Sequence, residues 1–437
     1  MKPETHHRVP VDTTGQPIIS IKDLSVHFAM RGSSISRLFG RSSGSVKAVD
    51  GINLDLAPGE VVGLVGESGS GKSTLGRAVL GMAPVTGGTI EYRGREISAL
   101  GEKQMRPLRK KLQMIFQDPH ASLNPSMTVG ESISDALRIH GLHPDDRPAA
   151  VAAALERVGL APASRFSPKY PTELSGGQKQ RAVIARAICL GPELLVADEP
   201  ISMLDMSVRA KILGLLDELR TDLGLTFIYI THDLASARFF CDRVAIMYLG
   251  RIVEIGPTEE IFSNPRHPYT KALLAAVPDP DPSREIPKEL PRGEVPDAAK
   301  PPAGCPFHPR CPAAFDKCGW EARDLRVVLE QRWTSVDLDT YEAESKKFGD
   351  LTNAETTDDK AVVKPGTGTA EQLLADLAQI KRDNPAEPFF SGVRSMAVEG
   401  GGVKLEFKPS VQPELLPIVA VNGEPESAVS VACHLYH

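Results

Sequence analysis

The sequence predicts an α/β fold with a largely parallel sheet that extends to about residue 262, followed by a C-terminal part of different organisation. Three short apolar runs are typical of buried strands: Val61–Val65, Leu194–Ala197 and Phe227–Ile230. Stretches of helical composition lie between them, such as Thr74–Met82 and residues 207–222. Strands that alternate with helices along a chain are typical of a parallel sheet covered by helices.

The first sixty residues predict strands that precede this sheet. Residues 18–30 alternate between apolar and polar side chains and predict a strand, and residues 47–56 predict a second one. The Ser-, Gly- and Arg-rich residues 31–47 between them predict a loop. The pair Pro58-Gly59 predicts a turn before the first buried run.

The middle of the chain predicts mostly helix and then a hairpin. Residues 114–116 are typical of a short strand, and residues 145–189 are typical of helices. Near the end of the α/β part, Val244–Met247 and Arg251–Glu254 predict two strands joined around Gly250.

The composition argues against a nucleic-acid-binding protein or a membrane-spanning one. The chain is 41% hydrophobic and 24% charged, and its net charge of −6 does not favour binding of nucleic acid. No apolar run reaches the about 18 residues that cross a bilayer, and the N-terminus lacks the apolar core of a signal peptide. We therefore expect the chain to be made in the cytosol and to stay there.

Prolines mark a change of organisation in the C-terminal part. Eleven of the 36 prolines lie between Pro278 and Pro312, which predicts a domain boundary. Residues 345–370 are polar and predict a flexible connection. Residues 371–437 regain apolar content and predict a small additional unit.

A glycine-rich segment between a predicted strand and a predicted helix matches the pattern of a phosphate-binding loop, the P-loop. Its glycines let backbone N–H groups point at phosphate oxygens, Lys72 places a cation on the β- and γ-phosphates, and Ser73 offers a hydroxyl to Mg²⁺. The helix that follows directs its positive N-terminal end at the same anions. The candidate nucleotide-binding residues here are Gly66, Ser68, Gly69, Ser70, Gly71, Lys72, Ser73 and Thr74.

Two acids follow the buried run Leu194–Ala197. In a P-loop protein this is the Walker B arrangement, in which Asp198 holds the Mg²⁺ shell and Glu199 orients and polarises the attacking water. Alone, two acids at this place would equally well cap the end of a strand. The P-loop lysine 126 residues earlier favours the catalytic interpretation.

The segment Leu174-Ser175-Gly176-Gly177-Gln178 resembles the signature motif of ATP-binding-cassette (ABC) ATPases. A serine and free N–H groups at a helix N-terminus form an anion site. The resemblance implies that Ser175, Gly176, Gly177 and Gln178 contact the ATP bound to the P-loop of a second subunit. It therefore implies that the site is complete only in a dimer.

Other segments match the same family in the same order. The resemblance implies that Gln117 senses Mg²⁺ close to the membrane subunits, that Asp205 belongs to the D-loop, and that the switch histidine His232 contacts the γ-phosphate. Phe28 is the candidate for the aromatic side chain that stacks on adenine, and a role in the core of a strand stays open for it. Met203 stands where the family commonly has Ala, which puts the D-loop contact between subunits in doubt. The implied Mg²⁺ ligands are Ser73, Gln117 and Asp198.

Finer motifs resemble the ATPases of oligopeptide and dipeptide importers, in particular the F-type subunit. They are the segments Ala121–Pro125, Tyr170-Pro171, Met247–Glu254 and His267–Leu274. The resemblance implies an ATPase that pairs with a D-type ATPase below two membrane permeases, which an extracytoplasmic solute-binding protein supplies. It places the chain peripherally on the cytoplasmic face of the inner membrane. An importer of another solute, such as a sugar or a metal chelate, and a non-transport ABC ATPase stay open as alternatives.

The resemblance also implies a division into domains. Residues 18–262 would form the P-loop NTPase fold of an ABC ATPase, with a RecA-like core, a β-subdomain and a helical subdomain at about residues 118–190. Residues 263–330 would be the extension typical of these importers, with the Pro-rich linker and a cysteine segment. Residues 331–437 would be an inserted, variable tail with the final cysteine segment.

Four cysteines form a second candidate site. Cys305, Cys311 and Cys318 lie within fourteen residues, and their spacing alone leaves a metal site and ordinary buried thiols equally open. Peptide-importer ATPases carry a similar segment, linked in some members to a [4Fe–4S] cluster, and their last cysteine is matched here by Cys433. The gap of 115 residues before Cys433 implies an insertion between about residues 330 and 428 that leaves and returns. Four thiolates would suit an iron–sulfur cluster or zinc.

Overall fold

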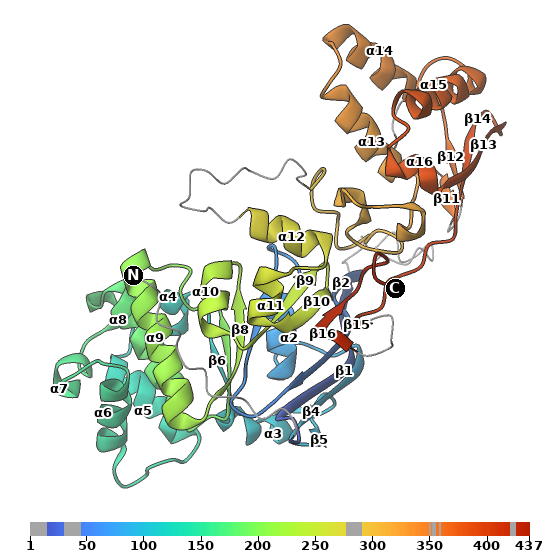
Figure 1. Ribbon diagram of the computed structural model, residues 1–437. Helices are drawn as coiled ribbons and strands as arrows, with labels where there is room; N and C mark the ends of the chain where they lie inside the picture. Colours follow the sequence, from blue (N-terminus) through green and yellow to red (C-terminus); the bar gives the residue numbers. More distant parts are fainter. Residues whose placement is uncertain are drawn as a thin grey trace, which may run out of the picture. The chain divides into compact units, whose positions relative to one another are not determined.

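The chain divides into two units in the computed structural model, Met1–Ser263 and Asn264–His437 (Figure 1). Each unit is described by itself. The structure describes residues 15–29, 45–276, 291–348, 351, 355–357, 360–419 and 425–437.

The first unit contains the parallel sheet that the apolar runs predict. Its strands lie in the spatial order β9-β3-β8-β7-β6, and β10 pairs antiparallel with β9. Every residue of β3, β7 and β8 is buried, because helices such as α2 and α10 pack against these strands. The elements are β3 (Val61–Val65), β6 (Leu112–Ile115), β7 (Leu194–Asp198), β8 (Thr226–Thr231), β9 (Arg243–Tyr248), β10 (Arg251–Pro257), α2 (Lys72–Val79) and α10 (Leu234–Phe240). The α/β fold is therefore confirmed, as is the hairpin around Gly250.

A smaller antiparallel sheet, in the order β2-β1-β4-β5, holds the N-terminal strands. It consists of β1 (Ile19–Ala29), β2 (Ser45–Leu56), β4 (Gly87–Tyr92) and β5 (Arg95–Glu96). The predicted strands at 18–30 and 47–56 are confirmed. The predicted loop at 31–47 lies mostly outside the described residues.

Several of the helices between β5 and β7, and after β7, begin at capping side chains. Thr128, Asp146, Ser175 and Asp205 each accept a hydrogen bond from a backbone N–H of the first turn of a helix, which satisfies a donor that has no partner within the helix. The helices are α3 (Glu102–Met105), α4 (Pro119–Ser122), α5 (Val129–Ile139), α6 (Arg147–Arg157), α7 (Ala163–Phe166), α8 (Gly176–Ile188), α9 (Met206–Leu223) and α11 (Thr258–Ser263).

The second unit begins with α12 (Pro268–Ala275) and contains a four-stranded antiparallel sheet in the order β11-β12-β14-β13. Its other elements include a hairpin formed by β15 and β16 close to the C-terminus. The elements are α13 (Asp324–Trp333), α14 (Leu338–Phe348), β11 (Glu355–Thr357), β12 (Lys360–Val363), α15 (Ala370–Asp383), α16 (Pro388–Gly392), β13 (Val393–Glu399), β14 (Gly402–Phe407), β15 (Leu416–Val419) and β16 (Pro425–Val431).

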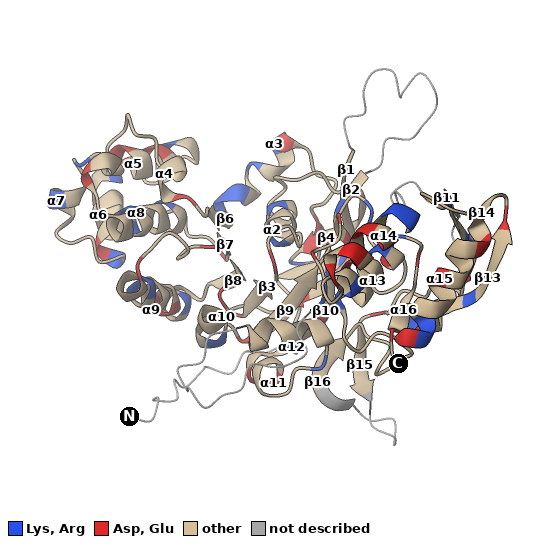
Figure 2. Cartoon of the chain, turned by 90° about the horizontal axis from the view of Figure 1, so that it is seen from above, with Lys and Arg blue, Asp and Glu red and all other residues tan. Residues whose placement is uncertain are grey.

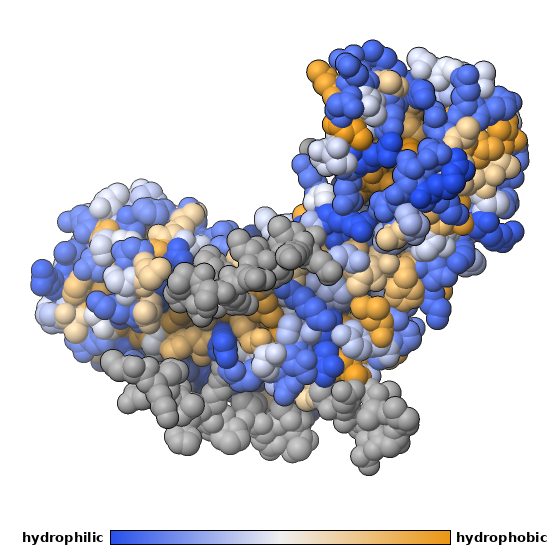
Figure 3. Space-filling view, turned by 45° about the horizontal axis from the view of Figure 1, so that its top comes forward, coloured by the Kyte–Doolittle hydropathy of each residue, from blue (hydrophilic) through white to orange (hydrophobic). Residues whose placement is uncertain are grey.

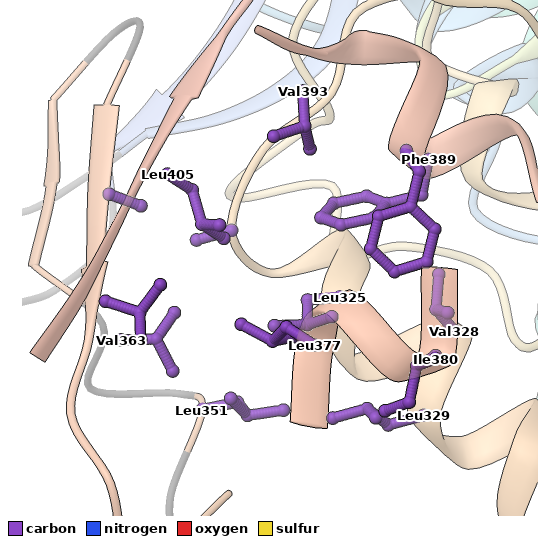
Figure 4. Packing of buried hydrophobic residues seen from close by; sticks show 14 of the residues in the cluster. Leu325, Val328, Leu329, Leu351, Val363, Leu377, Ile380, Phe389, Val393 and Leu405 are labelled. Atoms are coloured by element: carbon purple, nitrogen blue, oxygen red, sulfur yellow. The ribbon is translucent and has the colours of Figure 1, made fainter. Parts of the chain in front are cut away.

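Residues 320–409, which we call the insert, have a hydrophobic core of their own. Val363 and Leu405 of the sheet point toward Leu325 and Leu377 of the helices (Figure 4). The prediction of a flexible connection at 345–370 is therefore wrong where the structure describes this segment. α14 continues to Phe348, and every second residue of β12 is buried. β12 is a short apolar run inside a segment whose other residues are mostly polar, and the average composition of the segment hides it.

The visible face of the insert is mostly hydrophilic. Basic and acidic residues both occur along α14 and α15 (Figure 2), and most of the visible insert surface is coloured as hydrophilic in Figure 3. No helix among the described residues is both long and apolar enough to span a membrane.

The two ends of the insert meet. The Lys408 ammonium lies 2.7 Å from the carboxylate of Asp316, and a Cβ atom added to Gly319 would lie 2.9 Å from Cβ of Ser410. The chain thus leaves near Gly319 and returns near Ser410. Both points come earlier than the predicted limits of about 330 and 428.

Candidate nucleotide-binding site

The candidate site residues lie at the carboxyl ends of neighbouring parallel strands. The P-loop follows β3, Gln117 follows β6, Asp198 ends β7 and Glu199 comes next, and His232 follows β8. Because β3, β8, β7 and β6 are adjacent in this order, motifs that are far apart in sequence meet at one edge of the sheet. Ligands of open α/β sheets bind at this edge.

The P-loop rests on two other segments at positions where a side chain would not fit. A Cβ atom on Gly71, whose φ is +99°, would lie 2.0 Å from the Ala48 carbonyl oxygen, and one on Gly66 would lie 2.2 Å from the Met247 carbonyl oxygen. The N–H of Gly250 also donates to the Ser70 carbonyl over 3.0 Å. Sequence reasoning missed this support, and Ala48 in particular has no motif that could have revealed it.

Lys72 is held inside the loop that it follows. Its ammonium donates to the carbonyl oxygens of Gly66 and Glu67, each over 2.8 Å, and to the Ser70 hydroxyl over 3.2 Å. Burial lowers the pKa of Lys72 below its ordinary value, although the carboxylates of Glu199 and Asp198 oppose this effect. A buried ammonium whose contacts are mostly neutral oxygens is suited to binding an anion such as phosphate.

Ser73 and Asp198 form a pair of oxygen ligands beside the P-loop. The Ser73 hydroxyl donates to the Asp198 carboxylate over 2.8 Å. Burial raises the pKa of Asp198, although the hydrogen bond from Ser73 acts in the opposite direction. A hydroxyl and a carboxylate are ligands that fit Mg²⁺, and a bound cation would favour the charged form of this buried acid.

Glu199 is fixed from both sides. Its backbone has φ of +47°, which is unusual for a residue other than glycine. One carboxylate oxygen accepts a hydrogen bond from the Gln117 side-chain amide over 2.9 Å, and the other lies 2.9 Å from Nδ1 of His232. Because an ionised carboxylate only accepts hydrogen bonds, Nδ1 of His232 carries a proton in this contact. The structure thus brings together the three residues for which the sequence predicted catalytic roles.

The signature segment forms the start of α8. The Ser175 hydroxyl accepts from the N–H of Gln178, and the Gln178 side chain accepts from the N–H of Ser175, over 3.3 and 3.1 Å. Gly176 and Gly177 are the first residues of the helix, where N–H groups have no partner within the helix. A Cβ atom on Gly177 would lie 2.6 Å from a methyl group of Val208 in α9, so the glycine permits close packing of the two helices.

The remaining candidates lie on the surface near these segments. Asp205 caps α9 through the N–H of Val208 over 3.0 Å, and Met203 is 61% exposed. The ring of Phe28 is exposed, and its backbone pairs with Val46, two residues before the carbonyl of Ala48 under the P-loop. This placement favours stacking on a base over a role in the core. Ser68 is exposed, and Thr74 is half-buried in α2.

The four C-terminal cysteines lie near one another in the second unit. All four are buried. Burial raises the pKa of Cys305, and the thiols of Cys318, Cys311 and Cys433 add to the effect. Burial likewise raises the pKa of Cys311 to about 12. The chain therefore returns Cys433 to the other three, as the sequence predicted. Within the described residues, however, no group of three or more His, Cys, Asp or Glu side chains is arranged to hold a metal ion.

The cysteine segment shares its packing with the segment around α12. The ring of Phe307 lies 5.2 Å from that of Tyr269 and 5.8 Å from that of His267, measured between centroids. His267 is buried, and its Nδ1 accepts from the N–H of Tyr269 over 3.0 Å. Two segments that the sequence singled out thus pack together in the second unit.

Comparisons with known proteins agree with this arrangement. Residues 49–202 match the family described as ABC transporter, and residues 253–318 match the family described as oligopeptide/dipeptide transporter, C-terminal region. The oligopeptide transport ATP-binding protein AppF of Bacillus subtilis is 44% identical over 327 residues, which are 74% of this chain and 98% of AppF. The oligopeptide transport ATP-binding protein OppF of Salmonella typhimurium is 45% identical over 319 residues, 72% of this chain and 92% of OppF.

Proposed function

This chain belongs to the ATP-binding proteins of oligopeptide and dipeptide ABC transporters, and from this premise we propose how its residues hydrolyse ATP and which partners it serves. The observation that carries the proposal is the clamped carboxylate of Glu199, between Gln117 and His232, beside a P-loop that holds a buried lysine. This arrangement supplies a fixed acceptor for a proton of water next to a phosphate site.

In the proposed mechanism the P-loop N–H groups and Lys72 bind the phosphates of ATP. Ser73, Asp198 and the side-chain oxygen of Gln117 would hold Mg²⁺, which neutralises the charge of the phosphates when it is bound. Glu199 orients the attacking water, and His232 holds the carboxylate in place by donating from Nδ1. Catalysis of this kind depends on positioning and electrostatics rather than on a covalent intermediate.

A groove next to Gln117 supports contact with a permease. Its volume is about 240 Å³, and its lining includes Met82, Phe116 and Ile139, which are exposed apolar side chains. We propose that a cytoplasmic helix of a permease binds here through apolar side chains. Nucleotide-dependent movement of Gln117 would then reach the permeases through its neighbour Phe116.

We further propose that a second ATPase subunit completes the site. Ser175, Gly176 and Gly177 present a hydroxyl and N–H groups at the start of α8, and such groups bind anions. The partner would be a D-type ATPase, and both would work below two permeases and a solute-binding protein, peripherally on the cytoplasmic face of the inner membrane. Exposed Met203 would lie in the contact between the two ATPases.

For the cysteines we propose a metal or cluster bound by Cys305, Cys311, Cys318 and Cys433, either [4Fe–4S] or zinc. The support is that four buried thiols lie within electrostatic reach of one another. Binding would require the thiols to lose their protons and to move toward a common centre. Iron, sulfide and zinc analysis of anaerobically purified protein tests this proposal, and protein free of all three would end it.

The function is tested in vesicles that contain the two ATPases and the permeases, supplied with the binding protein. Glu199→Gln should keep ATP binding and reduce both hydrolysis and peptide uptake by at least about 100-fold. Glu218→Gln, which changes an exposed carboxylate of α9, is the matched control and should retain both activities. ATP-driven uptake of a labelled sugar or metal chelate, with no uptake of peptides, would instead support the alternative importers.

A further inference from the structure

The short helix α4 joins the residue that touches Glu199 to the signature helix. Gln117 is followed by Asp118, the side chain that caps α4. α4 packs against α8, whose N-cap is Ser175. Two side chains of α8 reach α4: Nζ of Lys179 lies 3.3 Å from Nδ1 of His120, and Arg186 donates to the Ser122 carbonyl over 2.8 Å.

The contact between Lys179 and His120 has a defined chemistry. Lys179 is only 9% exposed, and its ammonium can only donate hydrogen bonds. Nδ1 of His120 must therefore accept, which requires this nitrogen to carry no proton. His120 itself is exposed to solvent. Protonated at both nitrogens, the imidazole would lose the bond and place a second positive charge beside the ammonium.

We propose that His120 and Lys179 are positioning residues of the ATPase: their hydrogen bond couples Gln117 to the signature helix, and protonation of His120 breaks it. This inference rests on the proposed catalytic role of Glu199, which Gln117 contacts. The charged groups on α8 and at the start of α4 are Asp118, Lys179, Arg181 and Arg186. Arg181 donates to the Val158 carbonyl. Asp118 accepts the N–H of His120 over 2.7 Å. Arg186 binds the carbonyl of Ser122, two residues further along α4, so neither replaces the acceptor that Lys179 needs.

The test is steady-state ATP hydrolysis by the full-length chain together with the second ATPase, with kcat and KM measured between about pH 8 and about pH 6, the range in which histidines commonly change charge. At the upper pH, His120→Leu and Lys179→Met should each lower kcat about five- to tenfold, because each removes a charge-assisted hydrogen bond. KM for ATP should change less than about twofold, because the P-loop is untouched. The double variant should be no slower than either single variant, since all three lack the same bond.

The pH profile separates this role from a merely structural one. As the pH is lowered from about 8 to about 6, kcat of the wild type should decrease by the same five- to tenfold factor. His120→Asn offers an amide oxygen that does not titrate, so its kcat should depend less on pH. His143→Asn, a change at another exposed histidine, should keep the wild-type profile. Wild-type kcat and pH dependence in His120→Leu, or an unchanged pH dependence in His120→Asn, would overturn the proposal. Failure of peptide uptake in vesicles would concern only the proposed function, because this assay measures hydrolysis alone.

Discussion

The buried histidine at the start of α12 makes the second unit sensitive to acid. Burial lowers the pKa of His267 from 6.5 to about 3, and Lys271 adds to the effect. The unfolded chain therefore takes up a proton near its ordinary pKa, while the folded chain does so only near pH 3. The contribution of the neutral histidine to the free energy of unfolding is therefore complete above the pKa of the unfolded chain, and it is lost as the pH falls below that pKa. Between about pH 7 and about pH 5 the expected loss of unfolding free energy is about 2 kcal/mol.

The matched variant is His267→Asn, because an asparagine oxygen can replace Nδ1 as the cap for the N–H of Tyr269 and does not titrate. Both tryptophans of the chain, Trp320 and Trp333, lie in the second unit, and the ring of Trp320 lies 4.8 Å from that of His308 in the cysteine segment. Urea unfolding followed by tryptophan fluorescence in a Trp333→Phe background therefore reports on this region. The stability difference between the histidine and asparagine forms should change by about 2 kcal/mol over this pH range. A difference that does not change with pH would refute the reasoning.

Three further predictions concern the P-loop, an acidic residue and the insert. Gly71→Ala should weaken ATP binding by about 5-fold to about 150-fold in a fluorescent-nucleotide titration, as about 1–3 kcal/mol of strain implies. The control is Gly69→Ala, because Gly69 also has a positive φ but a Cβ atom there would meet no atom within 4 Å. Equal losses of ATP affinity in the two variants would show that the clash with the Ala48 carbonyl is irrelevant. Burial acts to raise the pKa of Glu193, but the hydrogen bond from Tyr92 and other contacts lower it to about 2. The stability that wild type has over Glu193→Gln should thus persist above pH 4.5 and disappear in acid unfolding toward about pH 2. Deletion of residues 320–409 should leave ATP hydrolysis within about twofold of wild type, because the ends of the insert meet; an insoluble or inactive protein would contradict this.

The sequence predicted the sheet, and it predicted residues that the structure brings together at the carboxyl ends of the strands, because both depend on short local patterns. Apolar runs such as Val61–Val65 predict buried strands without knowledge of their neighbours, and they are buried in the structure. The insert was harder to predict. β12 is a run of only four residues, Lys360–Val363, and the polar residues on both sides of it hide it in the composition of the segment. The support of Gly71 by the carbonyl of Ala48 could not be predicted either, because a backbone carbonyl leaves no trace in the sequence.

The architecture of the sheet explains which contacts a sequence reveals. Each parallel strand delivers one short motif at its carboxyl end, so Gln117 and Glu199 meet although 82 residues separate them, and Glu199 and His232 meet across 33. The order of the strands brings these motifs together. The contact between His120 and Lys179 arises instead from the packing of two helix faces 59 residues apart, and no local pattern announces it. Such a contact can change the response of the ATPase to pH without altering any motif residue, so differences in regulation between related ATPases are expected at helix contacts of this kind rather than in the motifs.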